Sequence, residues 1–160
     1  VDVIIVNLWF SGCEACKEEI PSLTEMDRRL SELGNAALIT ITTDDGSLGE
    51  KGRVTDVLPA VMQRVDADVV YACGPMAMLR SVAEVAAAQG AHSQCAVEEA
   101  MACGIGICMT CVLPVIGDDG VTRMLRSCVD GPVFRGDRVR WDEVGTVPPD
   151  TLGAPLSGGH

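Results

Sequence analysis

The chain has 160 residues, 48% hydrophobic and only 3% aromatic, with a formal net charge of −11. This length suits one medium domain or two small ones, whose core must be built from Ala, Val, Leu, Ile and Met. The charge excludes nucleic acid as an expected partner, because phosphate binding needs clustered positive charge.

No apolar run in the sequence approaches the length of a membrane span, so we expect no membrane partner. The first ten residues lack the basic flank and the small-residue cleavage site of a signal peptide. Four of the eight cysteines have a metal-ligand spacing and two more form a bare CxxC pair, which fits a reducing compartment better than a disulfide framework. The predicted location is therefore cytoplasmic.

Strands and helices alternate through the first part of the chain. Continuous apolar runs indicate buried strands, and apolar residues spaced by three and four indicate helices. The expected elements are strands over 3–10, 37–42 and 67–72 and helices over about 16–33, over 54–65 and between Pro75 and Gly90. This alternation predicts an α/β fold with a parallel sheet and crossover helices.

The pattern changes after about residue 98. Short apolar runs over 112–116 and 124–128, and a last strand over 139–141, predict a small unit that depends on a metal for order. The residues from 147 onward are rich in Pro and Gly and have no periodicity. We therefore expect three parts, which are an α/β nucleotide-binding-like domain over 1–98, a cysteine-rich cluster subdomain over 99–142 and a flexible tail over 143–160.

Four cysteines have the spacing C-x4-C-x2-C-x16-C, and two glycines lie in the first gap. They are Cys103, Cys108, Cys111 and Cys128. Plant-type 2Fe–2S clusters are held in this way, by three thiolates on one loop and a fourth from a later segment. The glycines allow the loop to wrap closely around an anionic cluster and to direct backbone N–H groups at its sulfurs. The spacing predicts a 2Fe–2S site.

Two other interpretations of these cysteines stay open. Four thiolates can hold zinc, although zinc ribbons usually pair two CxxC knuckles and this region has one. Free cysteines can also be small buried hydrophobes without any metal. A thiolate-to-iron absorption band would separate the first interpretation from these two.

Basic residues are concentrated close to the fourth cysteine. Five of the twelve Lys and Arg residues lie within 123–140, and only two acidic residues lie in the same range. These arginines form either an ordinary solvated face or a surface that balances the anionic cluster or meets an acidic partner. They are Arg123, Arg126, Arg135, Arg138 and Arg140.

Several motifs in the second half of the chain are typical of one family. They are Tyr71-Ala72-Cys73-Gly74-Pro75, Glu98 with Met101-Ala102-Cys103-Gly104-Ile105-Gly106, Cys108-x2-Cys111 and Cys128-Val129-Asp130-Gly131-Pro132-Val133-Phe134. With the polar stretch that begins at Thr43, they cover about residues 36–142. Over this range the chain resembles the electron-transfer subunit of B-type dihydroorotate dehydrogenases.

The resemblance implies an incomplete, ferredoxin-reductase-like NAD domain followed by the cluster subdomain. In that family electrons pass from a flavin-containing catalytic subunit through a 2Fe–2S cluster to FAD and then to NAD, in pyrimidine biosynthesis. It implies a hetero-oligomer with that catalytic subunit, which holds the catalytic residues. It also implies that the four cysteines are the cluster ligands and that Cys73, Gly74 and Pro75 lie beside the nicotinamide.

The family's FAD-binding barrel has no counterpart in these 160 residues. The sequence therefore leaves open whether this chain itself binds FAD or NAD and whether it is an enzyme alone.

A second resemblance involves residues 3–43. The stretch from Val6 to Leu23 is similar to the active-site strand and helix of a thioredoxin-like thiol reductase, with Cys13 and Cys16 where the strand meets the helix. A helix N-terminus there would lower the pKa of the Cys13 thiol. The alternative function is thiol–disulfide exchange by this pair. The alternative interpretation is a structural pair without redox activity, since no later proline has the setting of a thioredoxin cis-proline.

Overall fold

The computed structural model describes residues 49–154 without a break. It also describes residues 4–6, 42–43 and 45–46, and seven positions between 18 and 32, all of which are helical as predicted. The pair Cys13 and Cys16 lies outside the described residues, as do residues 37–41 of the second expected strand.

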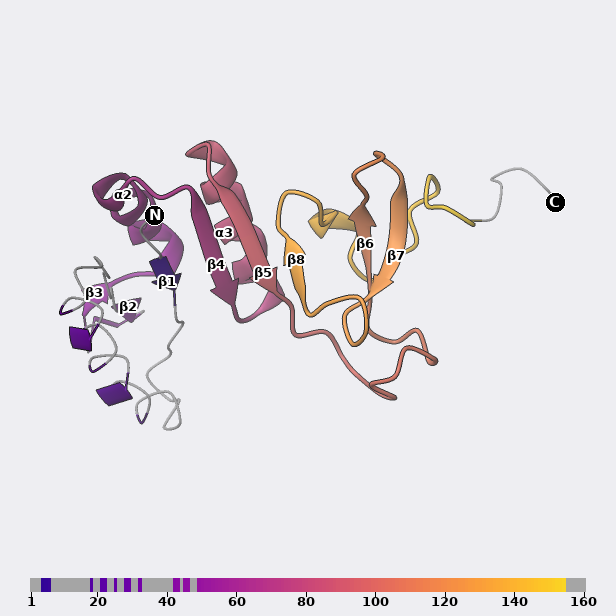
Figure 1. The fold of residues 1–160 in the computed structure, drawn as a ribbon, viewed down its shortest axis with the longest axis horizontal. Helices are drawn as coiled ribbons and strands as arrows, with labels where there is room; N and C mark the ends of the chain where they lie inside the picture. The colour runs from indigo at the N-terminus through magenta and orange to yellow at the C-terminus, as the bar shows by residue number, and fades with distance from the viewer. Residues whose placement is uncertain are drawn as a thin grey trace.

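In the part of the chain that the structure describes, the main sheet has four strands in the order β1-β4-β5-β8 (Figure 1). Strands β1 (Ile4–Val6), β4 (Val69–Cys73) and β5 (His92–Ala96) are parallel, and β8 (Val133–Arg135) is antiparallel to β5. Helix α3 (Met76–Ala88) connects β4 to β5, since parallel neighbours need a crossover connection. The fold is therefore mixed α/β, and β1 and β4 lie within or overlap the strands expected over 3–10 and 67–72.

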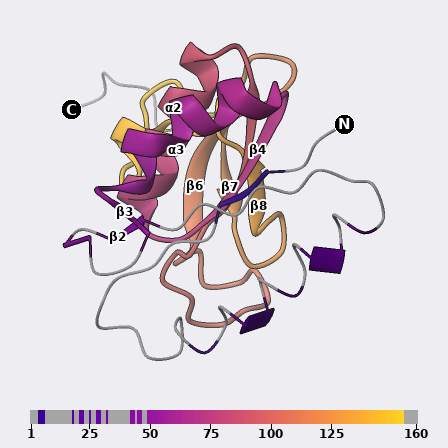
Figure 2. The same cartoon turned by 90° about the vertical axis from the view of Figure 1, so that its left-hand side faces the viewer.

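The two continuously described helices lie where the sequence predicts them. Helix α2 (Val54–Val65) begins after Arg53, whose backbone N–H donates to the Asp56 carboxylate at 2.8 Å, a side-chain cap of the first turn. Gly90 follows the end of α3, as expected for a helix C-terminus. Figure 2 shows α2 and α3 next to each other.

The described residues also form two small sheets. Strands β2 (Thr42–Thr43) and β3 (Glu50–Lys51) form a short parallel pair. Strands β6 (Val112–Ile116) and β7 (Thr122–Arg126) form an antiparallel hairpin. The run over 112–116 coincides with β6, whereas the run over 124–128 overlaps β7 only over 124–126, because Ser127 and Cys128 lie beyond the strand.

The predicted strand over 139–141 is wrong. Val139 makes only an isolated bridge to Val115, and the 3-10 helix η1 (Trp141–Glu143) follows at once. The Trp141 indole N–H donates to the Gly136 carbonyl at 2.8 Å, which holds the ring back against the preceding turn. The strand in this part of the chain is β8, which the sequence did not indicate.

One hydrophobic core joins the α/β part to the cysteine-rich part. Val70, Leu79 and Val82 from the first part belong to the same buried cluster as residues beyond position 98. Those later members are Leu113, Val115, Phe134 and Val139. The domain boundary near residue 98 stays a prediction, and the second part buries apolar side chains against the first.

The segment 147–154, which falls in the predicted tail, packs against β7. The Leu152 N–H donates to the Thr122 carbonyl at 2.8 Å, and Arg140 donates to Asp150 at 2.6 Å. None of the helices in the described residues has the length and hydropathy needed to cross a bilayer.

Candidate metal centre

The four cysteines of the predicted site come from two segments at one end of the β6–β7 hairpin. The loop after β5 includes three of them, and Figure 1 shows this loop beside the end of β7. Cys111 directly precedes β6, and Cys128 lies two residues beyond β7. Because Val112 pairs with Arg126 across the hairpin, the register brings these two cysteines together.

Ser127 links the two strands at the open end of the hairpin. Its backbone N–H donates to the Cys111 carbonyl at 2.9 Å, and its hydroxyl donates to the same oxygen at 3.1 Å. Ser127 and Cys111 are both buried. The thiols of Cys111 and Cys128 lie close enough to shift each other's pKa. The hairpin therefore closes the 16-residue gap between the third and fourth cysteines.

The first two cysteines form a second pair. The backbone N–H groups of Ile107 and Cys108 both donate to the Cys103 sulfur at 3.4 Å, and the two thiols also interact. Gly104 and Gly106 adopt positive φ angles of 68° and 79°, which turn the loop around that sulfur. Both glycines thus have the unusual φ that the sequence analysis expected of this loop, and their role around a cluster stays a prediction.

These hydrogen bonds decide which thiols lose a proton easily. The backbone N–H of Cys108, with those of neighbouring loop residues, lowers the pKa of Cys103 to about 6. The backbone N–H of Cys128 and the Ser127 hydroxyl lower the pKa of Cys111. The hydrogen bond to Cys111 raises the pKa of Cys128, and burial adds to the rise. Each pair thus holds one readily formed thiolate, the species that binds metal.

Arg126 connects the two cysteine segments. Its guanidinium donates to the Gly106 carbonyl at 3.2 Å and to the Asp130 carboxylate at 3.0 Å. Its backbone N–H also donates to Asp130, at 2.8 Å. The sequence placed this arginine in a basic stretch without indicating these partners.

Within the described residues, no three His, Cys, Asp or Glu side chains form a group that could hold a metal ion. The cysteines instead lie as two pairs, Cys103 with Cys108 and Cys111 with Cys128. A 2Fe–2S cluster needs two thiolates at each of two irons. The paired arrangement, the inward N–H groups and the lowered thiol pKa values fit such a cluster, and the ligand assignment stays a prediction.

The other sequence candidates lie elsewhere. Cys73 is the exposed last residue of β4, and Gly74 and Pro75 lead into α3, so this turn lies at the carboxyl end of a parallel strand. Cys95 is fully buried in β5, and burial raises its thiol pKa to about 11. His92 is exposed and is the first residue of β5.

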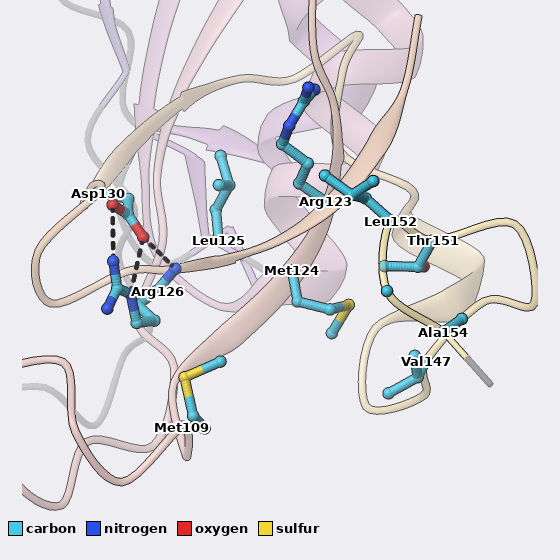
Figure 3. Close-up of a pocket in the computed structure, with 11 residues that line it drawn as sticks. Met109, Arg123, Met124, Leu125, Arg126, Asp130, Val147, Thr151, Leu152 and Ala154 are labelled. Atoms are coloured by element: carbon cyan, nitrogen blue, oxygen red, sulfur yellow. Dashed lines mark hydrogen bonds and ion pairs between the residues drawn. The ribbon is translucent and has the colours of Figure 1, made fainter.

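A pocket of about 510 Å³ lies between β7 and the segment 147–154 (Figure 3). Met109 of the cysteine loop, Arg126 and Asp130 are on one side of it, and Leu152 and Ala154 are on the other. No sequence motif indicates this pocket, because it depends on the return of the segment 147–154 to β7.

Comparison with protein families identifies the cysteine segment. Residues 98–140 match the model of the iron–sulfur cluster binding domain of dihydroorotate dehydrogenase B. The resemblance expected from the motifs is thereby confirmed for this segment, which matches that family's iron–sulfur cluster binding domain.

Curated relatives agree. A dihydroorotate dehydrogenase B (NAD(+)) electron transfer subunit from Caldanaerobacter subterraneus is 42% identical over 101 residues, which are 63% of this chain and 40% of the relative. A probable subunit of the same kind from Methanopyrus kandleri is 37% identical over 86% of this chain and 47% of its own length. The chain thus spans less than half the length of these relatives.

A solved structure is also similar. It is that of an NADH-dependent reduced ferredoxin-NADP oxidoreductase, described in connection with flavin-based electron bifurcation. The match has a TM-score of 0.56 and 33% sequence identity, and it covers 71% of this chain and 38% of the other.

Proposed function

We propose that the chain is the iron–sulfur electron-transfer component of a B-type dihydroorotate dehydrogenase. It would take electrons from a flavin-containing catalytic subunit through a 2Fe–2S cluster and pass them toward NAD, by way of FAD in the complete family. The observation that carries this proposal is the two-pair cysteine geometry inside the segment that matches the family's cluster-binding domain.

The ligands follow from the pairing. Cys103 and Cys108 would hold one iron, and Cys111 and Cys128 the other. When bound, the cluster supplies reversible one-electron transfer by a change of iron valence. The chain's own part is to keep the thiols deprotonated and in place. The N–H groups of Ile107 and Cys108 donate to the Cys103 sulfur in the first pair, and Ser127 donates to the Cys111 carbonyl and so holds the second pair in place.

The α/β part would serve as the reductase side of the component. Its parallel strands and the turn of Cys73, Gly74 and Pro75 suit a nicotinamide at the carboxyl edge of the sheet, where open α/β folds bind ligands. In the family the FAD barrel precedes the matched range, and we assign no FAD contact to the described residues. We also propose that the domain boundary lies near residue 98 and that the protein is located in the cytoplasm.

The catalytic subunit would dock over the cysteine loop. Apolar residues on this loop and on the turn of Cys128 have exposed fractions from 48% to 75%, and Ile107 is the most exposed of them. Clustered exposed apolar groups of this kind mark interaction surfaces. This apolar rim consists of Met101, Ile105, Ile107, Met109 and Val129. An Ile107→Glu variant should keep its iron and lose affinity for the catalytic subunit in a pull-down or titration.

The direct test is the iron content of single Cys→Ser variants purified without oxygen. Changing Cys103, Cys108, Cys111 or Cys128 should reduce the iron well below the value of about two per chain expected for a 2Fe–2S site. Changing the exposed Cys73 should leave the content unchanged. A Cys128→Ser chain with full iron, or a wild-type chain with stoichiometric zinc, would refute the ligand assignment.

A further inference from the structure

We propose that Arg126 is a positioning residue that locks the two cysteine segments together and raises the reduction potential of the cluster. The inference rests on the proposed function, because it requires a bound cluster. From the sequence, a role in balancing the anionic cluster was expected only of the arginine stretch as a group.

The guanidinium of Arg126 contacts both ligand segments at once. One nitrogen, Nη1, donates to the Gly106 carbonyl between the first two cysteines, at 3.2 Å. Nε and Nη2 donate to the two carboxylate oxygens of Asp130, at 3.0 and 3.3 Å, on the turn that holds Cys128. Figure 3 shows this pair at the end of β7. The planar fork of Arg suits such a link, and a Lys would keep only the charge.

The two segments approach closely at this link. A Cβ on Gly106 would lie 3.0 Å from the Val129 side chain and 3.2 Å from Arg126 Nη1. The backbone of the cysteine loop therefore lies directly against the guanidinium. Loss of the Arg126 side chain would leave the Gly106 carbonyl without this donor and free the loop from the turn.

The charge of Arg126 acts on the same site. Entry of one electron without a proton makes a cluster with four thiolates more negative by one unit charge. A cation beside the ligand loop stabilises this more negative form and so raises the potential. Asp130 offsets part of that effect, since its carboxylate pairs with the same guanidinium at 3.0 Å. Removal of the two charges should therefore shift the potential in opposite directions.

Arg123 supplies a matched control on the same strand. It pairs with Asp119 at 2.7 Å, and its side chain is 37% exposed, the same fraction as that of Arg126. Its other hydrogen bond goes to the Val121 carbonyl, in the β6–β7 turn at the opposite end of the hairpin from the cysteines. Arg123→Gln changes the net charge of the chain as Arg126→Gln does, without touching a cysteine segment.

The test compares wild type with R126Q, R126K, D130N and R123Q, all purified without oxygen. Iron and sulfide are measured first, and each loaded protein is then titrated with dithionite while its EPR signal or absorbance is followed. At a fixed solution potential, R126Q should lower the ratio of reduced to oxidised cluster about three- to tenfold. A tenfold change corresponds to 59 mV for a one-electron couple. D130N should shift the ratio the other way, and R123Q should leave it unchanged.

R126K separates the two roles. It should keep the wild-type potential, because the charge remains, and lose iron to a chelator faster, because the fork to Gly106 and Asp130 is gone. If R126Q does not retain iron, D130N still tests the sign of the charge effect. A loaded R126Q with the wild-type potential, or an equal shift in R123Q, would overturn the inference alone. A wild-type chain that binds no iron would overturn the proposed function, and the inference with it.

Discussion

Substitution of Gly106 by Ala tests how closely the cysteine loop approaches the turn of the fourth cysteine. Gly106 has a φ of +79°, and an added Cβ would lie 3.0 Å from Val129 Cγ2 and 3.2 Å from Arg126 Nη1. Gly104 is the matched control. Its φ is +68°, but an added Cβ would meet only the Met101 sulfur, at an ordinary 3.8 Å.

The two substitutions should differ by the cost of the close approach. Both place a Cβ in the left-handed region, which costs about 1 kcal/mol in each case. Only Gly106→Ala also displaces Val129 and the hydrogen bond from Arg126, which adds about 1–2 kcal/mol. We therefore expect Gly104→Ala to cost about 1 kcal/mol and Gly106→Ala about 2–3 kcal/mol.

The assay is urea unfolding of the iron-loaded chain, followed by circular dichroism, together with the rate of iron loss from the loaded chain to a chelator. Gly106→Ala should lower the unfolding free energy more than Gly104→Ala and should release iron faster. Equal effects of the two variants would show that the segments are not in contact as described.

Three further predictions concern stability and thiol chemistry. Leu79→Ala empties a fully buried position in the shared core and should reduce the unfolding free energy by about 2–5 kcal/mol, measured by urea titration. At pH 8 iodoacetamide should modify the exposed Cys73 in the folded protein and should modify Cys95 only after urea unfolds the chain, because burial raises the pKa of the Cys95 thiol to about 11. Equal labelling of both cysteines in the folded protein, measured by mass spectrometry, would contradict this. The Arg123 guanidinium lowers the pKa of the Asp119 carboxyl. The ion pair therefore stabilises the fold above about pH 4, and this contribution is lost on acidification. The Asp119→Asn variant should lose less stability than wild type between about pH 4 and pH 2.

Local patterns in the sequence predicted the helices well. Helix α2 has the bounds expected from its apolar spacing, and α3 lies between the Pro and Gly that mark helix ends. Both helices bury an apolar stripe whose period is visible in the sequence. The cysteine spacing likewise identified the segment that matches a cluster-binding domain.

Features that depend on long-range contacts were missed. Strand β8 has only three residues, and its pairing with β5 depends on the path of the chain through the cluster segment. The expected strand over 139–141 does not form, because Val139 makes only one isolated bridge and the Trp141 indole is hydrogen-bonded to the preceding turn.

The division of the cysteines into pairs follows from the register of the hairpin, which spacing alone does not contain. Val112 opposite Arg126 brings Cys111 to Cys128, and the same register places the Arg126 guanidinium against Gly106.

The most direct test of the account is the spectrum of the protein purified without oxygen. We predict a brown chain with about two iron and two sulfide, and after reduction an EPR signal of one unpaired electron per chain. A colourless protein, or one with zinc bound by the same four thiols, would contradict the account.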